Sequence, residues 1–273
     1  VSETHSFMKV DRELLELCER VSAASYKAIK DLVGTPEAYT TLYIGADGTP
    51  TKLIDDASES AIILELEKAG RPTRIISEEC GEKIIGCDPK IALIMDPLDG
   101  THNAAMGIPF YSISIAIANP CLSGINFGYV KDFTTGDVYC AELGKGAYLN
   151  GNRIYTSARS DIMDFCVSVY GYHPHVTKTT NLCQAVRRIR ILGCVSLELC
   201  YVACGKLDAF VDVRGSLRLT DVAAGKLILE EAGGIVSDEK GRKLLLQDNV
   251  VNRVYMVATN GISHQQILDI TGR

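Results

Sequence analysis

Tryptophan is absent from this chain of 273 residues, and aromatic residues make up only 7% of it. No apolar run approaches the roughly 18 residues that are needed to cross a bilayer. The first residues are polar and lack the apolar stretch of a signal peptide. We therefore expect a protein of a reducing compartment, the cytoplasm, with no membrane partner.

Paired cysteines are also missing. The chain has ten cysteines, but none forms a Cys-x-x-Cys pair, and the chain is not a short secreted scaffold. Several of them, such as Cys166 and Cys200, lie within apolar runs, where cysteine packs as a small apolar side chain. This spacing argues against a zinc site and a disulfide framework, and it predicts reduced, structural cysteines.

Several function classes are excluded by signatures that the sequence lacks. It contains no Walker loop, no His-Glu-x-x-His and no Gly-x-Ser-x-Gly, which argues against the nucleotide-loop, zinc-protease and hydrolase-elbow classes. The formal net charge of −6 argues against non-specific nucleic-acid binding, which needs basic residues to neutralise phosphates. With 47% hydrophobic and 23% charged residues, the composition is that of an ordinary globular protein without a nucleic-acid partner.

The pattern of apolar residues changes twice along the chain. Up to about residue 100 it predicts helices and short strands, at 8–33, 40–44, 55–69, 74–77 and 91–95. Consecutive strands follow, at 112–118, 124–131, 136–141 and 146–148. Beyond about residue 158, strands and helices alternate, at 165–169, 178–186, 188–192, 196–204, 209–213, 221–232, 235–237, 254–258 and 262–270. This order predicts an α+β half over residues 1–158 and an α/β half over 159–273, packed as one compact unit.

The strongest local signal is the hexapeptide Asp-Pro-Leu-Asp-Gly-Thr at 96–101, which directly follows the apolar strand 91–95. Carboxylates held close together at the end of a buried strand repel one another, and a divalent cation would relieve the repulsion. Oxygen ligands without His or Cys favour a hard ion such as Mg²⁺ or Mn²⁺. Asp, Pro and Gly also favour simple turns, so the hexapeptide alone leaves a turn and a metal site equally open.

Three further acidic positions accompany this hexapeptide. Glu78 and Glu79 follow a short strand, whereas Asp55 and Asp221 each open a predicted helix. Each position has a local alternative, because Asp55 and Asp221 could cap their helices and the two glutamates could form a solvated pair. Taken singly, each of these residues is better explained by its local alternative than by a metal site.

In this order the motifs resemble the inositol monophosphatase/fructose-1,6-bisphosphatase superfamily, and more closely its archaeal-type members that act on both substrates. The resemblance spans nearly the whole chain and rests on residues 55, 77–79, 96–101, 144–151, 221–225 and 231–234. It implies the layered αβαβα sugar-phosphatase fold. It also implies a homodimer, with a tetramer as the alternative.

The resemblance implies a metal site with two or three Mg²⁺ ions, which Mn²⁺ could replace. By matching position, the ligands would be Glu78, Asp96, the Leu98 carbonyl and Asp99, with Asp221 joining Asp96 and Asp99 at a second ion. The loop 45–52 would close over this site and could hold a weaker third metal.

The resemblance also implies the roles of the catalytic residues. Thr101 and Asp55 would orient a metal-activated water that Glu78 helps to activate, and the attack would be direct, without a phosphoenzyme. The substrate would lie against Asp99, and its phosphate would rest on the backbone amides of Gly100 and Thr101.

Substrate contacts beyond the phosphate are implied at Arg190, Val195 and Arg214. The planar fork of arginine suits a second phosphate, although either arginine could instead form a surface ion pair. Two positions depart from many relatives, because Thr220 stands where they have Trp, and Ala104 where they have an aromatic residue.

The resemblance, together with these residues, implies a Mg²⁺-dependent phosphomonoesterase for inositol-1-phosphate, the C1 phosphate of fructose-1,6-bisphosphate, or both. The alternatives are a nucleotide phosphatase of the 3′-phosphoadenosine 5′-phosphate type and a non-catalytic homologue that binds metabolites.

Overall fold

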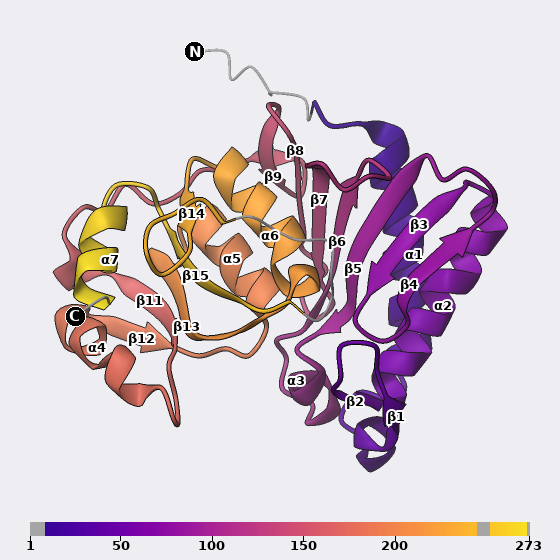
Figure 1. Ribbon diagram of the computed structural model, residues 1–273, viewed down its shortest axis with the longest axis horizontal. Coiled ribbons are helices and arrows are strands. Elements are labelled where there is room, and N and C mark those ends of the chain that lie inside the picture. The colour runs from indigo at the N-terminus through magenta and orange to yellow at the C-terminus, as the bar shows by residue number, and fades with distance from the viewer. Residues whose placement is uncertain (1–8, 245–251, 272–273) are drawn as a thin grey trace.

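The computed structural model describes residues 9–244 and 252–271, which form alternating layers of helix and sheet (Figure 1). Helices α1 (Arg12–Ile29) and α2 (Leu53–Ala69) cover the outer face of the first sheet. Helices α5 (Val195–Ala203) and α6 (Leu219–Glu231) lie between the two sheets. The outer face of the second sheet carries α4 (Thr180–Ala185) and α7 (His264–Thr271). This arrangement confirms the expected αβαβα layers.

The first sheet has eight strands in the order β10-β9-β8-β7-β6-β5-β3-β4. Their bounds are β3 (Thr73–Ser77), β4 (Gly81–Ile85), β5 (Ile91–Asp99), β6 (Ser112–Ala118), β7 (Ile125–Asp132), β8 (Val138–Glu142), β9 (Gly146–Leu149) and β10 (Asn152–Arg153). Neighbouring strands are antiparallel except β3 and β5, which run parallel. The predicted run of antiparallel strands is confirmed, whereas the edge strand β4 was not expected from its half-exposed residues.

The second sheet has five strands in the order β12-β11-β13-β15-β14. Their bounds are β11 (Cys166–Tyr170), β12 (Arg188–Arg190), β13 (Ala209–Leu217), β14 (Ile235–Ser237) and β15 (Val254–Thr259). Strand β11 is parallel to both β12 and β13, whereas β15 is antiparallel to β13 and β14. The sheet is therefore mixed rather than fully parallel. The proposed boundary near residue 158 stays a prediction.

Three hydrophobic clusters fill the spaces between these layers. The largest packs α5 and α6 between both sheets, and residues such as Ile94, Leu199 and Phe210 are buried in it. A second lies under α1 and α2, and a third lies under α4 and α7. Because α6 lies in the middle layer, its first turn is held firmly against the first sheet.

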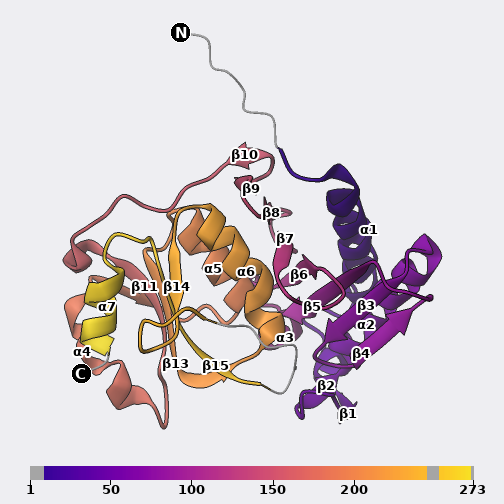
Figure 2. The same cartoon turned by 45° about the horizontal axis from the view of Figure 1, so that its top comes forward.

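Two small elements complete the edge where the functional residues lie. Strands β1 (Thr41–Ile44) and β2 (Pro50–Lys52) form a hairpin, and α3 (Thr101–Ala105) follows β5 directly. Figure 2 shows this hairpin, α3 and the N-terminal end of α6 on the same side of the molecule. The first helix is shorter than the predicted range 8–33, whose first residue lies outside the described part of the chain. No helix within the described ranges is both long and apolar enough to cross a membrane.

Candidate active site

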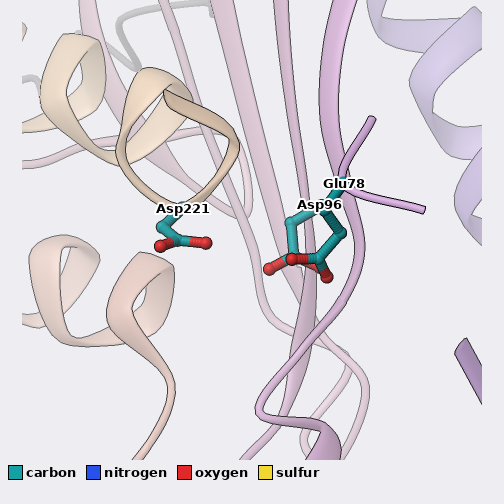
Figure 3. A group of neighbouring side chains, drawn as sticks. All are labelled: Glu78, Asp96 and Asp221. Atoms are coloured by element: carbon teal, nitrogen blue, oxygen red, sulfur yellow. The ribbon is translucent and has the colours of Figure 1, made fainter. Parts of the chain in front are cut away.

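Three carboxylates converge where β3, β5 and α6 meet. Glu78 follows β3, Asp96 lies in β5, and Asp221 lies in the first turn of α6 (Figure 3). One carboxylate oxygen from each lies within 4.8 Å of the others, and all three side chains are buried. The parallel pairing of β3 with β5 brings Glu78 and Asp96 to the same edge of the sheet. The middle layer then places Asp221 opposite them.

The pKa of Glu78 is raised to about 8, chiefly by burial and also by the charges of neighbouring carboxylates, while Arg218 opposes the rise. Burial and the charges of Glu78 and Asp99 also raise the pKa of Asp96 well above its ordinary value. Protons, an arginine or a metal ion can each offset this concentration of negative charge. The donors are oxygen atoms only, which suits a hard divalent cation.

A guanidinium that the sequence motifs did not single out also lies in this cluster. Arg218 forms ion pairs with Glu78, with Asp221 (Nε to Oδ1, 3.0 Å) and with Asp47 of the hairpin (Nη1 to Oδ2, 2.8 Å). These charges raise its pKa well above the ordinary value, although burial opposes them. The only sequence signal is its place three residues before Asp221, at the start of α6.

Asp55 and Thr101 meet although 46 residues separate them. The Thr101 hydroxyl is 2.8 Å from the Asp55 carboxylate and 3.1 Å from the Leu98 carbonyl oxygen. Burial raises the pKa of Asp55 to about 6, while hydrogen bonds from Thr101 and the Lys52 amide lower it. The structure thus brings together the residues expected to orient water, and their roles stay predictions.

The structure does not confirm either local alternative for the acidic residues. Neither Asp55 nor Asp221 is the N-cap of its helix. The N-caps are Lys52 and Arg218, whose backbone amides donate to these two aspartates three residues further on (3.2 and 2.8 Å). This hydrogen bond uses one oxygen of each carboxylate and so does not exclude a second role. The solvated-pair interpretation of Glu78 and Glu79 is wrong, because only 6% and 7% of these residues is exposed.

Glu79 was not expected to take part in the site. Its carboxylate accepts a hydrogen bond from the Thr51 hydroxyl of the hairpin, and burial raises its pKa to about 7. The backbone carbonyls of Glu78 and Glu79 accept hydrogen bonds from the amides of Asp47 (3.1 Å) and Ala46 (3.0 Å). The two glutamates therefore fasten the hairpin to the end of β3.

Asp99 is oriented differently from the three converging carboxylates. It accepts hydrogen bonds from the amides of Ser196 (2.6 Å) and Val195 (3.3 Å) at the N-terminus of α5. Among the described residues, the group within 4.8 Å does not include it. Its predicted role as a metal ligand stays a prediction. Val195, an expected substrate residue, lies directly beside it.

Gly100 occupies a position that only glycine fits. Its φ of 88° is left-handed, and an added Cβ would lie 3.0 Å from the Phe110 carbonyl oxygen and 3.3 Å from the Cys194 Cβ. The chain can therefore turn sharply from β5 into α3, which places Thr101 next to Asp55. The phosphate seat expected on the Gly100 and Thr101 amides stays a prediction.

The two expected substrate arginines have different surroundings. The Arg214 Nε donates to the buried Asp212 at 3.1 Å, and its guanidinium stacks on the rings of Tyr170 and Tyr172 at 4.7 and 4.9 Å. Arg190, at the end of β12, is exposed and donates to the Ile189 carbonyl at 2.8 Å. Arg214 is thus held rigidly, whereas Arg190 is presented on the surface.

The two departures from the motif pattern lie beside the site. Thr220 is fully buried, and its hydroxyl has no hydrogen-bond partner among the described residues. Ala104 is also fully buried, in the cluster beneath α1 and α2.

Comparisons with known proteins agree with this geometry. The sequence profile of the inositol monophosphatase family matches residues 12–271. A fructose-1,6-bisphosphatase/inositol-1-monophosphatase from Methanothermobacter thermautotrophicus is 44% identical over 260 residues, covering 91% of this chain and 93% of that protein. A bifunctional NADP phosphatase/NAD kinase from Methanococcus maripaludis is 36% identical, covering 95% of this chain but only 49% of that protein.

A solved structure of an inositol monophosphatase-fructose 1,6 bisphosphatase superimposes with a TM-score of 0.84 at 30% identity. The match covers 96% of this chain and 100% of that one. The sequence similarity extends over both sheets and every element that carries a converging carboxylate. This chain therefore belongs to the inositol monophosphatase family of phosphatases.

Proposed function

We propose that this protein is a Mg²⁺-dependent phosphomonoesterase that hydrolyses inositol-1-phosphate, the C1 phosphate of fructose-1,6-bisphosphate, or both. The convergence of Glu78, Asp96 and Asp221 is the observation that carries the proposal. The pairing of Thr101 with Asp55 supports it, since this pair can hold a water molecule by hydrogen bonds. The relatives named for these two substrates make them the first to test.

Glu78, Asp96 and Asp221 would hold the metal, with Asp99 and the Leu98 carbonyl as the remaining ligands. Bound Mg²⁺ would lower the pKa of water and neutralise charge on the phosphate. The Thr101 hydroxyl donates to Asp55 and the Leu98 carbonyl, so it would accept the hydrogen bond from the attacking water and thereby aim it. By resemblance to the family, the attack would be direct, without a phosphoenzyme, and the metal and the positioned hydroxyl would supply charge neutralisation and orientation.

Substrate would lie between the carboxylates and the second sheet. Tyr170 of β11 links Arg214 to the segment that precedes α5. Its hydroxyl accepts a hydrogen bond from the Gly193 amide (2.8 Å), and its ring stacks on Arg214. Val195 and Arg214 would then contact the sugar or a second phosphate, and Arg190 would reach it from the surface. Because Asp212 neutralises part of its charge and two rings hold its guanidinium, Arg214 would orient the substrate more than attract it by charge.

A nucleotide phosphatase is the second candidate. The relative named a bifunctional NADP phosphatase/NAD kinase matches nearly all of this chain, so a phosphorylated nucleotide deserves the same test as the sugars. The 3′-phosphoadenosine 5′-phosphate type belongs to the same class.

The test is phosphate release with and without Mg²⁺ from inositol-1-phosphate, fructose-1,6-bisphosphate, NADP and adenosine 3′,5′-bisphosphate, beside an Asp221→Asn control. We expect Mg²⁺-dependent release from one or both sugar phosphates and its loss in the variant. Faster release from either nucleotide would favour the second candidate. Release that continues with a chelator present, or in Asp221→Asn, would refute the metal mechanism.

We also propose a homodimer of the cytoplasm, by resemblance to the family. Sedimentation at micromolar concentration would show twice the mass of the 29.6 kDa chain. A monomer would refute this proposal, and a fourfold mass would indicate a tetramer.

A further inference from the structure

Arg218 holds both oxygens of Asp221. Its backbone amide donates to Oδ2 at 2.8 Å, and its side-chain Nε donates to Oδ1 at 3.0 Å. Its Nη1 forms the ion pair with Glu78. The guanidinium therefore lies between two of the three carboxylates that converge in the site, and its nitrogens contact an oxygen of each.

The same guanidinium also reaches the hairpin. Nη1 of Arg218 lies 2.8 Å from Oδ2 of Asp47, whose carboxylate is 1% exposed. The Asp47 amide is bonded in turn to the Glu78 carbonyl, so the hairpin and the carboxylates share this arginine. An arginine that moved away from Glu78 and Asp221 would still have a buried partner in Asp47.

We propose that Arg218 is an internal competitor of the divalent cation and thereby sets the affinity of the metal site. The inference rests on the metal site in the proposed function. Binding of a cation to Glu78 and Asp221 must displace the guanidinium from them or share their oxygens with it, and Asp47 retains it nearby.

The charges determine the direction of the effect. An arginine stays protonated at any pH at which the protein is folded, so its positive charge in the cluster is permanent. Replacing it with a neutral side chain leaves the same carboxylates with one fewer positive charge to repel an incoming cation. The metal site should then bind more tightly, although the protein without a cation should be less stable.

The test is Mn²⁺ binding to Arg218→Gln without substrate, measured by electron paramagnetic resonance of the free ion. We expect the dissociation constant to fall at least tenfold relative to wild type. Arg214→Gln is the matched control, because Arg214 is also partly buried but pairs with Asp212 rather than with the three carboxylates. Its Mn²⁺ dissociation constant should stay within twofold of wild type.

Thermal unfolding provides the second measurement. In a chelator Arg218→Gln should unfold at a lower temperature than wild type. Saturating Mg²⁺ should raise the unfolding temperature of the variant by more than it raises that of wild type. Unchanged or weaker Mn²⁺ binding by a folded Arg218→Gln would overturn this inference while the proposed function stands. A wild-type protein that binds no Mn²⁺ would overturn both.

Discussion

The hydroxyl of Thr101 lies 2.8 Å from the carboxylate of Asp55, and the two residues come from the start of α3 and the first turn of α2. The pair stands beside the converging carboxylates, because Thr101 follows β5 while the Lys52 amide fixes Asp55 from the other side. We therefore expect this pair to orient water without binding the metal directly.

Replacing Thr101 by valine keeps its shape and removes the hydroxyl. We expect kcat for phosphate release to fall by about 10²-fold, the lower end of what a positioned proton acceptor contributes. Thr101→Ser should restore most of the activity, and Mn²⁺ binding should change little in either variant. A valine variant that keeps more than a third of the wild-type kcat would rule out this role.

Without divalent cations, the unfolding temperature should fall as the pH rises from about 5 to 8. Burial raises the pKa of Glu78 from 4.5 to about 8 and that of Asp55 to about 6, so the folded state holds protons that the unfolded state has released. This stabilisation is fully present below the ordinary pKa values and is lost as the pH rises through the raised ones.

Glu78→Gln should remove much of this pH dependence, because the amide carries no proton that titrates. Saturating Mg²⁺ should raise the unfolding temperature, whereas a rise in pH lowers it, because a cation binds and stabilises the deprotonated carboxylates. Calorimetry in a chelator and in Mg²⁺ would measure both effects. An unfolding temperature that is flat or rising over this range in the chelator would contradict the prediction.

Glu231 lies at the end of α6, away from the three converging carboxylates, and we expect it to stabilise the fold. Its carboxylate accepts hydrogen bonds from the amides of Gly144 and Gly146, both at 2.7 Å, and so ties α6 to the β8–β9 turn. Glu231→Ala should lower the free energy of unfolding by about 1–3 kcal/mol, because hydrogen bonds to a charged group are lost.

The neighbouring Glu230 is the matched control, since it pairs with Lys226 along the helix surface at 2.7 Å. Glu230→Ala should cost less than about 0.5 kcal/mol, as is usual for such pairs. Urea denaturation would measure both variants. Equal losses would show that the contact with the turn contributes nothing beyond a surface ion pair.

Gly100→Ala should destabilise the protein more than Gly136→Ala, a substitution at a glycine whose surroundings are open. Both Gly100 (φ 88°) and Gly136 (φ 80°) are left-handed, but an added Cβ has nothing within 4 Å at Gly136 and three close neighbours at Gly100. Gly136→Ala should cost about 1 kcal/mol for backbone strain. Gly100→Ala should add roughly 1–3 kcal/mol for crowding. Equal unfolding free energies of the two variants would contradict this explanation.

Most elements could be predicted from the sequence, because apolar periodicity follows directly from which face of an element is buried. The strands of the first sheet after residue 112 and the helix that carries Asp221 are examples. The edge strand β4 could not be predicted in this way, because after the buried Gly81 its residues are only partly buried or exposed. The mixed direction of the second sheet depends on pairing between strands distant in the chain, which local periodicity does not encode.

The acidic motifs by themselves predicted the family, which the comparisons confirm, and the residues expected to bind a metal, because each carboxylate follows a strand or opens a helix. Only the tertiary structure decided which of them meet. It brought Glu78, Asp96 and Asp221 together, turned Asp99 toward the amides of α5, and placed Arg218 among the carboxylates. The pairing of β3 with β5 joins Glu78 to Asp96, and the packing of α5 and α6 between the two sheets brings Asp99, Arg218 and Asp221 to partners far away in the chain.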